Sequence, residues 1–249
     1  MESLVLKKTV AVFAVSIALG FASVSHAKSI IQDFEGGNVS PATIFFNNDG
    51  TGGGDSLAAE GLPDVTAFAG AGGGSAGDAV ASLGLSANGG VGGSQAAVLT
   101  LTNSTETAFA FAGVTQSIGF AIGNPTDYQA SVEVLAPAGV PLSLRVESTF
   151  GPTTNNGFSL NFVGTGAYET IGGILGTDLV ANAAGAFDVT DTNTIIIVGS
   201  PIGIDVPVGV DQEIFIDNFS FKAIAIPEPS ALVILLSLGS IVAVRRRRS

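Results

Sequence analysis

Apolar residues alternate with small or polar ones along the second half of the chain. The alternation is clearest in four segments, at 118–122, 132–134, 142–146 and 158–162. Because successive side chains of a β-strand point to opposite faces, a period of two predicts strands with one buried face. Further apolar segments predict strands at 98–102, 109–111, 194–198 and 213–224.

Turn signals rich in Gly, Pro and Asn separate these segments, for example at 123–125, 137–139 and 155–157. No capped helical pattern of useful length interrupts them. Short strands joined by such turns are typical of antiparallel sandwiches. We therefore predict an all-β body at residues 28–226: a single, jelly-roll-like antiparallel β-sandwich, flanked by an N-terminal signal helix and a C-terminal transmembrane helix.

The stretch 47–95 departs from this pattern. It holds 15 glycines in 49 residues, with Phe68 as its one aromatic residue. Glycine loses much backbone entropy on ordering and buries little surface. We expect a long, loop-like excursion here, with one or two strands around 78–85. It does not match a phosphate-binding loop, because no Gly-Lys-Ser/Thr follows.

The N-terminal segment carries the features of a secretory signal. Lys7 and Lys8 precede an uncharged, mostly apolar run at 9–21, and the small residues Ser25 and Ala27 flank His26. This order predicts a signal peptide at 1–27 that is cleaved after Ala27. The alternative is an uncleaved anchor, which the short apolar run disfavours.

The C-terminal segment 227–249 has three elements in order. Pro227, Glu228 and Pro229 precede an apolar run at 231–244, and a basic cluster follows, made of Arg245, Arg246, Arg247 and Arg248. A 14-residue helix rises only about 21 Å, less than the hydrocarbon core, so spanning requires snorkelling arginines or local thinning. The arginines are expected to stay cytoplasmic. An ordinary C-terminal anchor is the simpler alternative.

These three elements resemble the PEP-CTERM sorting signal of Gram-negative bacteria. The resemblance implies export by the general secretion machinery and transient anchoring in the inner membrane. It also implies recognition by an exosortase, which removes the tail near Pro227-Glu228-Pro229. The mature protein is then expected at the cell surface or outside the cell. The resemblance covers about the last 23 residues and leaves the role of the body open.

Charge and missing residue types exclude several functions. Residues 28–226 contain 19 acidic residues and three basic ones, a formal net charge of −16. Such a surface repels nucleic acid, so we expect no nucleic-acid partner. The chain has no cysteine, and its one histidine lies in the predicted signal peptide. Thiol chemistry, histidine-ligated metals and Ser-His-Asp catalysis are therefore excluded from the mature chain.

Two acidic segments bracket the body, at 33–37 and 211–221. In the second, Ile214 and Ile216 occupy one strand phase, whereas Phe219 and Phe221 occupy the other. Either a β-bulge lies at 217–218, or Asp217 points the same way as the phenylalanines. An inward carboxylate needs a partner, and cations are scarce in the body, so a metal is one hypothesis.

The opening Phe34-Glu35-Gly36 and the closing 216–221 resemble the end strands of jelly rolls of the carbohydrate-binding-module type. The resemblance implies a structural calcium ion with Glu35 and Asp217 as ligands and Asp33 as a further candidate, since calcium prefers oxygen ligands. The alternative is that these acids are solvated at strand ends. Such modules stack sugars on aromatic residues, yet the chain has no tryptophan and only Tyr128 and Tyr168.

Three functions follow from the sequence. The first is a non-enzymatic, exported and exosortase-processed surface or matrix protein, with a structural or adhesive role associated with exopolysaccharide. The alternative is a carbohydrate-binding module. The third, a secreted glycoside hydrolase, requires only a pair of carboxylates, and the sequence indicates none of the pairs in particular. We expect no enzymatic activity.

Overall fold

The computed structural model describes residues 28–47, 51–52, 54–72, 75, 77–105, 109–151, 154–182, 187–199 and 208–224. Contacts group Ser29–Ile224 into one compact unit. The predicted signal peptide with its cleavage site at Ala27, and the sorting segment with Pro227-Glu228-Pro229 and the four arginines, lie outside the described residues. Within the described ranges, no helix is long and apolar enough to cross a membrane.

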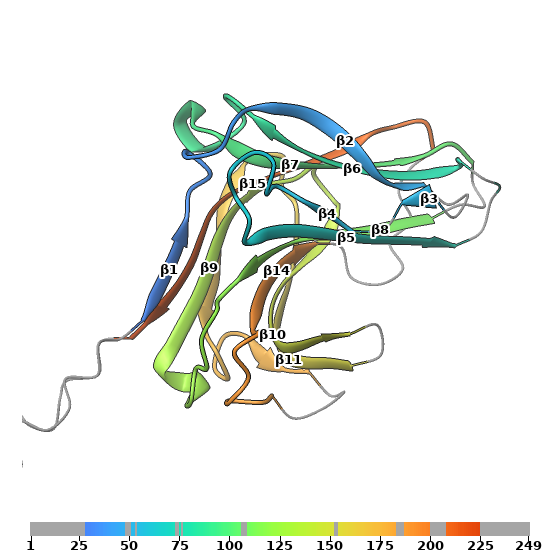
Figure 1. Ribbon diagram of the computed structural model, residues 1–249. Coiled ribbons are helices and arrows are strands. Elements are labelled where there is room, and N and C mark those ends of the chain that lie inside the picture. The colour runs from blue at the N-terminus through green and yellow to red at the C-terminus, as the bar shows by residue number, and fades with distance from the viewer. Residues whose placement is uncertain are drawn as a thin grey trace, which may run out of the picture. The chain divides into compact units, whose positions relative to one another are not determined.

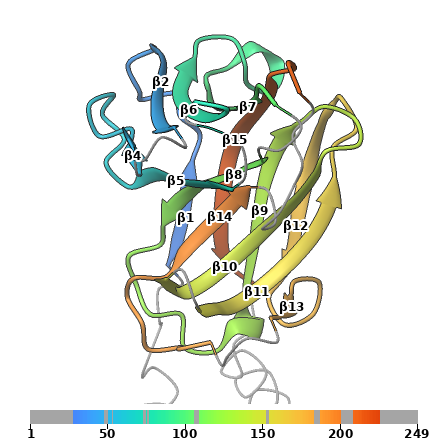
Figure 2. The ribbon, with the colours of Figure 1, turned by 90° about the vertical axis from the view of Figure 1, so that its right-hand side faces the viewer.

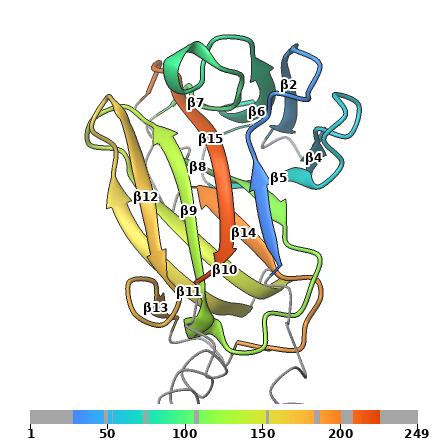
Figure 3. The same ribbon diagram turned by 90° about the vertical axis from the view of Figure 1, so that its left-hand side faces the viewer.

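Two antiparallel sheets pack face to face, which confirms the predicted β-sandwich (Figures 1–3). Sheet A has eight strands: β12 (Tyr168–Ile174), β9 (Tyr128–Leu135), β15 (Gln212–Ala223), β7 (Ala96–Asn103), β6 (Ala79–Ser86), β2 (Ser40–Asn47), β3 (Thr51–Gly52) and, beside β15, β1 (Ser29–Gln32). Sheet B has seven: β13 (Val180–Ala181), β11 (Thr154–Val163), β10 (Pro141–Gly151), β14 (Ile195–Gly199), β8 (Phe109–Ser117), β5 (Val65–Gly72) and β4 (Asp55–Ser56). The 3₁₀ turns η1 (Val91–Gly93) and η2 (Pro125–Asp127) complete the described elements.

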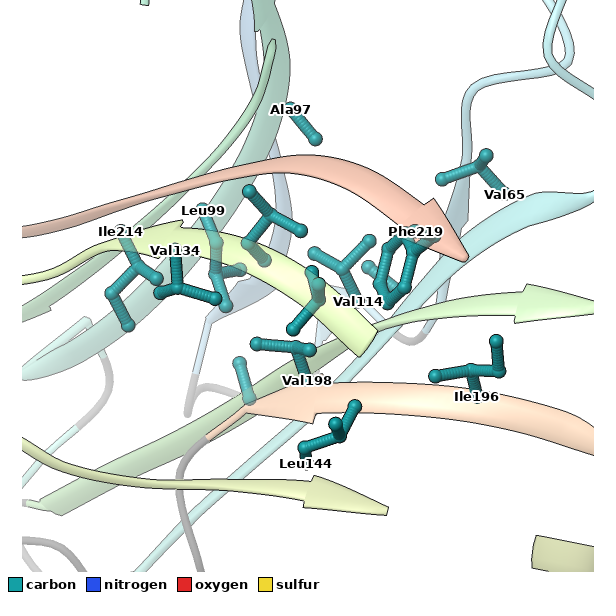
Figure 4. Packing of buried hydrophobic residues seen from close by; sticks show 14 of the residues in the cluster. Val65, Ala97, Leu99, Val114, Val134, Leu144, Ile196, Val198, Ile214 and Phe219 are labelled. Atoms are coloured by element: carbon teal, nitrogen blue, oxygen red, sulfur yellow. The ribbon is translucent and has the colours of Figure 1, made fainter. Parts of the chain in front are cut away.

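The core forms where the apolar phases of both sheets meet. Leu99 and Ile214 of sheet A face Val114, Leu144 and Ile196 of sheet B (Figure 4). All five side chains are fully buried. The alternation in the sequence therefore marks the inner face of each strand correctly, because burying one side of a pleated strand requires a period of two. The opposite phase of each strand forms the outer faces, on which the candidate sites lie.

The glycine-rich stretch is ordered more extensively than the sequence predicts. The expected strand near 78–85 is present as β6, but β5 also pairs along its whole length with β8. Val65 and Ala67 fill the inner phase of β5, and an aromatic ring of β8 covers Gly70 on the outer phase. The prediction of a loop failed here because small residues form a strand when a neighbouring strand supplies the bulk that they lack.

The segment 118–122 is a second correction. Ile118, Phe120 and Ile122 are buried as the alternation predicts, but they lie in an irregular connection rather than in a strand. Gly119 and Gly123 have φ values of +70° and +63°. This left-handed conformation, which favours glycine, interrupts a regular ladder while still allowing alternate side chains to reach the core.

Of the two alternatives for the last strand, the structure shows the β-bulge. The pairing of β15 with β9 shifts register between Asp217 and Ser220, and Asn218 has a φ of +49°. Before the bulge β15 pairs with β7, and after it with β1 (Figure 3). The bulge lets both Ile216 and Phe219 face the core, so Asp217 is not forced into it.

Candidate functional site

The outer face of sheet B contains side chains that are buried without belonging to the core. Figure 2 looks onto this face, with β5, β8, β14, β10 and β11 side by side. Inner-phase residues of β10 and β14 contact the core, so Arg145, Glu147 and Ile197 belong to the outer phase. Nevertheless Ile197 is 0% and Glu147 1% exposed. Other parts of the protein therefore cover the middle of this face.

Two phenylalanine rings lie flat on this face. Phe68 of β5 pairs with Gly113 of β8, and Phe111 of β8 pairs with Gly70 of β5. A Cβ atom at Gly113 would stand 2.7 Å from the Phe68 ring, and one at Gly70 would overlap the Phe111 ring. Each ring thus occupies the space above the opposite glycine. Both rings remain partly exposed, so they form an aromatic platform, the Phe68/Phe111 platform.

The platform comes from a repeated tetrapeptide. Ala-Phe-Ala-Gly occurs at 67–70 and again at 110–113. In the antiparallel register Ala69 pairs with Ala112, which places each phenylalanine opposite the other copy's glycine. The space above Gly113 also lies 3.3 Å from Ile197, so the apolar surface continues from β5 across β8 to β14.

An ion pair lies beside this apolar surface on the same face. Arg145 Nη1 is 3.0 Å from Glu147 Oε1, with side-chain exposures of 13% and 1%. Burial raises the pKa of the Glu147 carboxyl, and the Arg145 guanidinium opposes that shift. Among the residues that the structure describes, Oε1 accepts no aligned hydrogen bond. The ion pair is thus almost entirely buried on the outer side of sheet B.

Hydroxyl and amide groups surround the platform and the ion pair. The Thr66 and Thr115 hydroxyls are 2.6 Å apart, and Ser159 donates to Asn182 Oδ1 at 2.5 Å. By strand phase, Ser143 and Asn161 lie on the same face. The face thus combines apolar rings with neutral donors and acceptors and one ion pair, which is a composition suited to a ligand that is apolar on one side and hydroxylated at its edges.

The acids predicted as metal ligands lie elsewhere, on the outer side of sheet A. Asp217 is 1% exposed and is covered by the loop between β6 and β7. Its Oδ2 accepts hydrogen bonds from the Val91 amide at 3.0 Å and the Ser94 hydroxyl at 2.9 Å, and its Oδ1 accepts from the Asn218 amide at 2.7 Å. These donors supply the partners that a buried carboxylate requires.

Glu35, which follows β1, contacts the same loop between β6 and β7. Its Oε1 accepts a hydrogen bond from the Gln95 amide at 2.8 Å, whereas Asp33 Oδ1 accepts from the Glu35 amide at 3.3 Å. The Tyr168 hydroxyl donates to the Gly89 carbonyl at the other end of the loop. Loop 89–95 is thus fixed by side chains from three separate parts of the chain.

The geometry does not favour a calcium ion between Glu35 and Asp217. N–H and O–H donors point at the carboxylate oxygens that a cation would require. Among the described residues, no group of three or more acidic or histidine side chains is placed to hold a metal. The calcium site of Glu35, Asp217 and Asp33 stays a prediction.

The two tyrosines considered for sugar stacking are both engaged in packing. The Tyr128 ring stacks on Phe221, with centroids 5.0 Å apart and an angle of 14°. The Tyr168 hydroxyl donates to the Gly89 carbonyl of loop 89–95. Burial is the largest cause that raises the pKa of Tyr168 to about 12, and the nearby Asp217 and Glu133 carboxylates add to it. Sequence reasoning missed the phenylalanine platform. The repeated Ala-Phe-Ala-Gly was the available signal, but the first copy lay in the stretch predicted to be a loop.

Comparisons with known proteins add similarities of fold. No family model and no curated protein matches the chain. A family 11 carbohydrate-binding module of the cellulase Lic26A-Cel5E from Clostridium thermocellum is similar over 75% of this chain and 97% of its own, with 10% identity and a TM-score of 0.42. The K1 adhesin domain of Lys-gingipain from Porphyromonas gingivalis is similar over 80% and 99%, with 12% identity and a TM-score of 0.42. Similarity at this level identifies neither a family nor a ligand, so the function is inferred from the chain's own residues.

Proposed function

We propose that the body of this protein is a non-catalytic carbohydrate-binding module whose ligand lies on the outer face of sheet B. The observation that carries the proposal is the partly exposed Phe68/Phe111 platform on the face that also holds the Arg145–Glu147 pair. We place this function before a purely structural role because the face combines partly exposed aromatic rings with polar groups.

The platform suits the apolar side of a sugar. A pyranose ring presents C–H groups on its faces, and these pack on flat aromatic rings. The rings fit closely over Gly70 and Gly113 because neither glycine has a Cβ, so each ring packs against the backbone of the opposite strand. A platform that is already fixed loses little conformational entropy on binding, and this raises affinity.

The polar groups suit the hydroxylated edges of a sugar. The partly exposed Arg145 offers N–H donors, and Ser159 and the exposed Asn161 offer hydroxyl and amide groups. Adjacent strands are 4.7–4.9 Å apart, so the face from β5 to β11 is roughly 19 Å wide. A segment of several sugar units therefore fits across the strands, which favours a polysaccharide over a monosaccharide.

The arrangement of acids disfavours glycoside hydrolysis. Within the described outer phase of β5, β8, β14, β10 and β11, Glu147 is the one carboxylate. Hydrolysis by the usual mechanisms needs two carboxylates flanking the bond. We therefore propose binding without turnover, and chromogenic glycosides should remain uncleaved.

We also propose that the protein is exported to the cell surface. The N-terminal and C-terminal sequence patterns support export, exosortase processing and release at the cell surface, where binding to exopolysaccharide would have an adhesive or structural effect. Intact-mass measurement of the exported protein tests this part. A mass beginning at Lys28 and lacking Arg245–Arg248 agrees with it, and a mass that retains the arginines contradicts tail removal.

The binding face is tested by replacing its aromatic residues. We expect purified protein to bind one or more neutral polysaccharides, and Phe68→Ala or Phe111→Ala to weaken binding about tenfold or more, as buried aromatic anchors do. Phe215→Ala is the matched control, because Phe215 also lies against a glycine, Gly89, but on sheet A. Equal losses from Phe68→Ala and Phe215→Ala would contradict the assignment of the face.

A further inference from the structure

The chain contains two Asn-Gly pairs, and the structure places them in different surroundings. Asn88-Gly89 lies in the connection between β6 and β7, whereas Asn156-Gly157 lies inside β11. In an Asn-Gly pair the backbone nitrogen of the glycine can attack the side-chain amide of the asparagine, because glycine has no Cβ to obstruct the approach. The surroundings of each pair therefore decide whether this reaction occurs in the folded protein.

At Asn88 both reacting groups are available. Asn88 is exposed at a bend, outside the β6–β7 ladder, which ends at the pair of Ser86 and Ala96. Among the residues that the structure describes, the Asn88 side chain makes no hydrogen bond and the Gly89 N–H group donates none. The peptide between the two residues can also turn without moving the Gly89 carbonyl, because glycine permits the compensating rotation about its own φ.

At Asn156 the backbone is held in a ladder. Asn156 pairs with Thr149 and Gly157 pairs with Glu147, both on β10. The strands approach so closely that a Cβ atom on Gly157 would overlap the Val146 carbonyl. A backbone that is fixed in this way reacts only when the ladder opens locally, so its reaction rate is reduced by the small fraction of molecules that are open.

We infer that Asn88 is a site of spontaneous deamidation, and that the resulting isoaspartyl linkage releases loop 89–95. The Gly89 nitrogen bonds to Asn88 Cγ, and its proton leaves with the side-chain nitrogen as ammonia, so that a cyclic succinimide forms. Water then opens the ring at either carbonyl carbon. One opening gives aspartate, and the other gives isoaspartate, in which the backbone runs through the former side chain. Water is the one co-reactant, and nothing is oxidised or reduced.

The modification acts on loop 89–95 because Gly89 anchors one end of it. The Tyr168 hydroxyl donates to the Gly89 carbonyl, and a Cβ atom on Gly89 would stand 2.6 Å from the Phe215 ring. An isoaspartyl linkage lengthens the backbone by one methylene group immediately before this closely packed glycine. The Gly89 carbonyl is then displaced from Tyr168, and the Val91 amide, which donates to Asp217, follows two residues later. This chemistry is independent of the proposed carbohydrate ligand.

The site is tested by incubating the purified protein in mildly alkaline buffer, which favours loss of the Gly89 amide proton. Peptide mapping by mass spectrometry then gives the extent of reaction at each Asn-Gly pair. In the folded protein we expect Asn88 to react about tenfold or more faster than Asn156, because the ladder protects Asn156. In concentrated urea the two rates should become similar. Similar rates in the folded protein, or an Asn88 that reacts only in urea, would overturn the site.

Two variants test the release of the loop. Asn88→Gln blocks the reaction, because its longer side chain would have to close a larger ring, and freshly purified Asn88→Asp carries the new charge without the longer backbone. Both should protect the Val91 amide against hydrogen exchange as fresh wild-type protein does. Incubated wild-type protein should lose about tenfold or more of this protection, as a freed loop would. Full protection of Val91 in protein that contains isoaspartate at position 88, or an equal loss in incubated Asn88→Gln, would refute the release.

Discussion

The ring of Phe68 lies directly above Gly113 on the neighbouring strand, where a Cβ atom would come within 2.7 Å of the ring. The reciprocal contact of Phe111 with Gly70 completes a platform that neither strand could form alone. Gly70, one of the glycines on which the expectation of a loop rested, and Gly113 on β8 thus leave the space in which the two aromatic rings lie.

Gly113→Ala should weaken both folding and binding. The added methyl group meets the Phe68 ring, which must tilt away from its position above β8. Overpacking of this kind typically lowers the free energy of unfolding by about 1–3 kcal/mol. We expect that loss in urea denaturation, together with reduced glycan affinity. Gly36→Ala is the matched control, since a Cβ there meets nothing within 4 Å, and equal effects of the two substitutions would refute the packing argument.

Asp217→Asn should destabilise the protein and loosen loop 89–95. In the wild-type protein the Asp217 carboxylate accepts hydrogen bonds from the backbone N–H groups of Val91 and Asn218 and from the Ser94 hydroxyl. The substitution turns an N–H group of the new side-chain amide toward at least one of these donors. A buried polar group left without its partner costs about 1–3 kcal/mol. Urea denaturation and hydrogen exchange of the Val91 amide measure the two effects. Asp211→Asn, at an exposed position, should change both only slightly.

Calcium should stabilise the protein no more than sodium at matched ionic strength. The acidic body gains stability from any screening cation, but the oxygens of Asp217 and Glu35 already face hydrogen-bond donors. Thermal unfolding with each salt and with a chelator gives the comparison. A rise in Tm specific to calcium, absent from Asp217→Asn, would establish the metal site that the sequence suggests.

Tyr168 should titrate far above the ordinary value. Burial, followed by the Asp217 and Glu133 carboxylates, raises its pKa from 10.0 to about 12. The folded state holds this proton more tightly than the unfolded state does. The resulting contribution to the free energy of unfolding is therefore fully present below pH 10 and is lost as the pH rises through about 12. Ultraviolet titration of Tyr128→Phe isolates the transition. Glu133→Gln should lower the midpoint, and an unchanged midpoint would remove Glu133 as a cause.

The β-sandwich was predictable from sequence because burial on one side of a strand imposes a period of two. Leu142, Leu144 and Val146 show this directly, as their alternation needs no knowledge of the neighbouring strands. The change of phase between Ile216 and Phe219 narrowed the last strand to two alternatives, and only the pairing with β9 shows that a bulge is present.

The proposed binding face was not predictable from the sequence because it depends on pairing between distant strands. Phe68 and Gly113 are 45 positions apart, and only the register of β5 with β8 brings them together. Likewise, the partners of Asp217 come from a hairpin loop more than 120 residues earlier in the chain, whereas the sequence suggested a metal because cations were few. The sequence pattern shows that a buried carboxylate at Asp217 would need a partner. It does not show which backbone N–H or hydroxyl group is that partner.

The most direct test of the binding face is a nuclear magnetic resonance titration of the isotope-labelled protein with a neutral oligosaccharide that it binds. The account predicts that amide shifts concentrate in β5, β8, β14 and β10, at Ala69, Ala112 and Arg145 above all, while β9, β12 and loop 89–95 of sheet A change little. Shifts concentrated on sheet A, or no saturable shift with any neutral oligosaccharide, would contradict it.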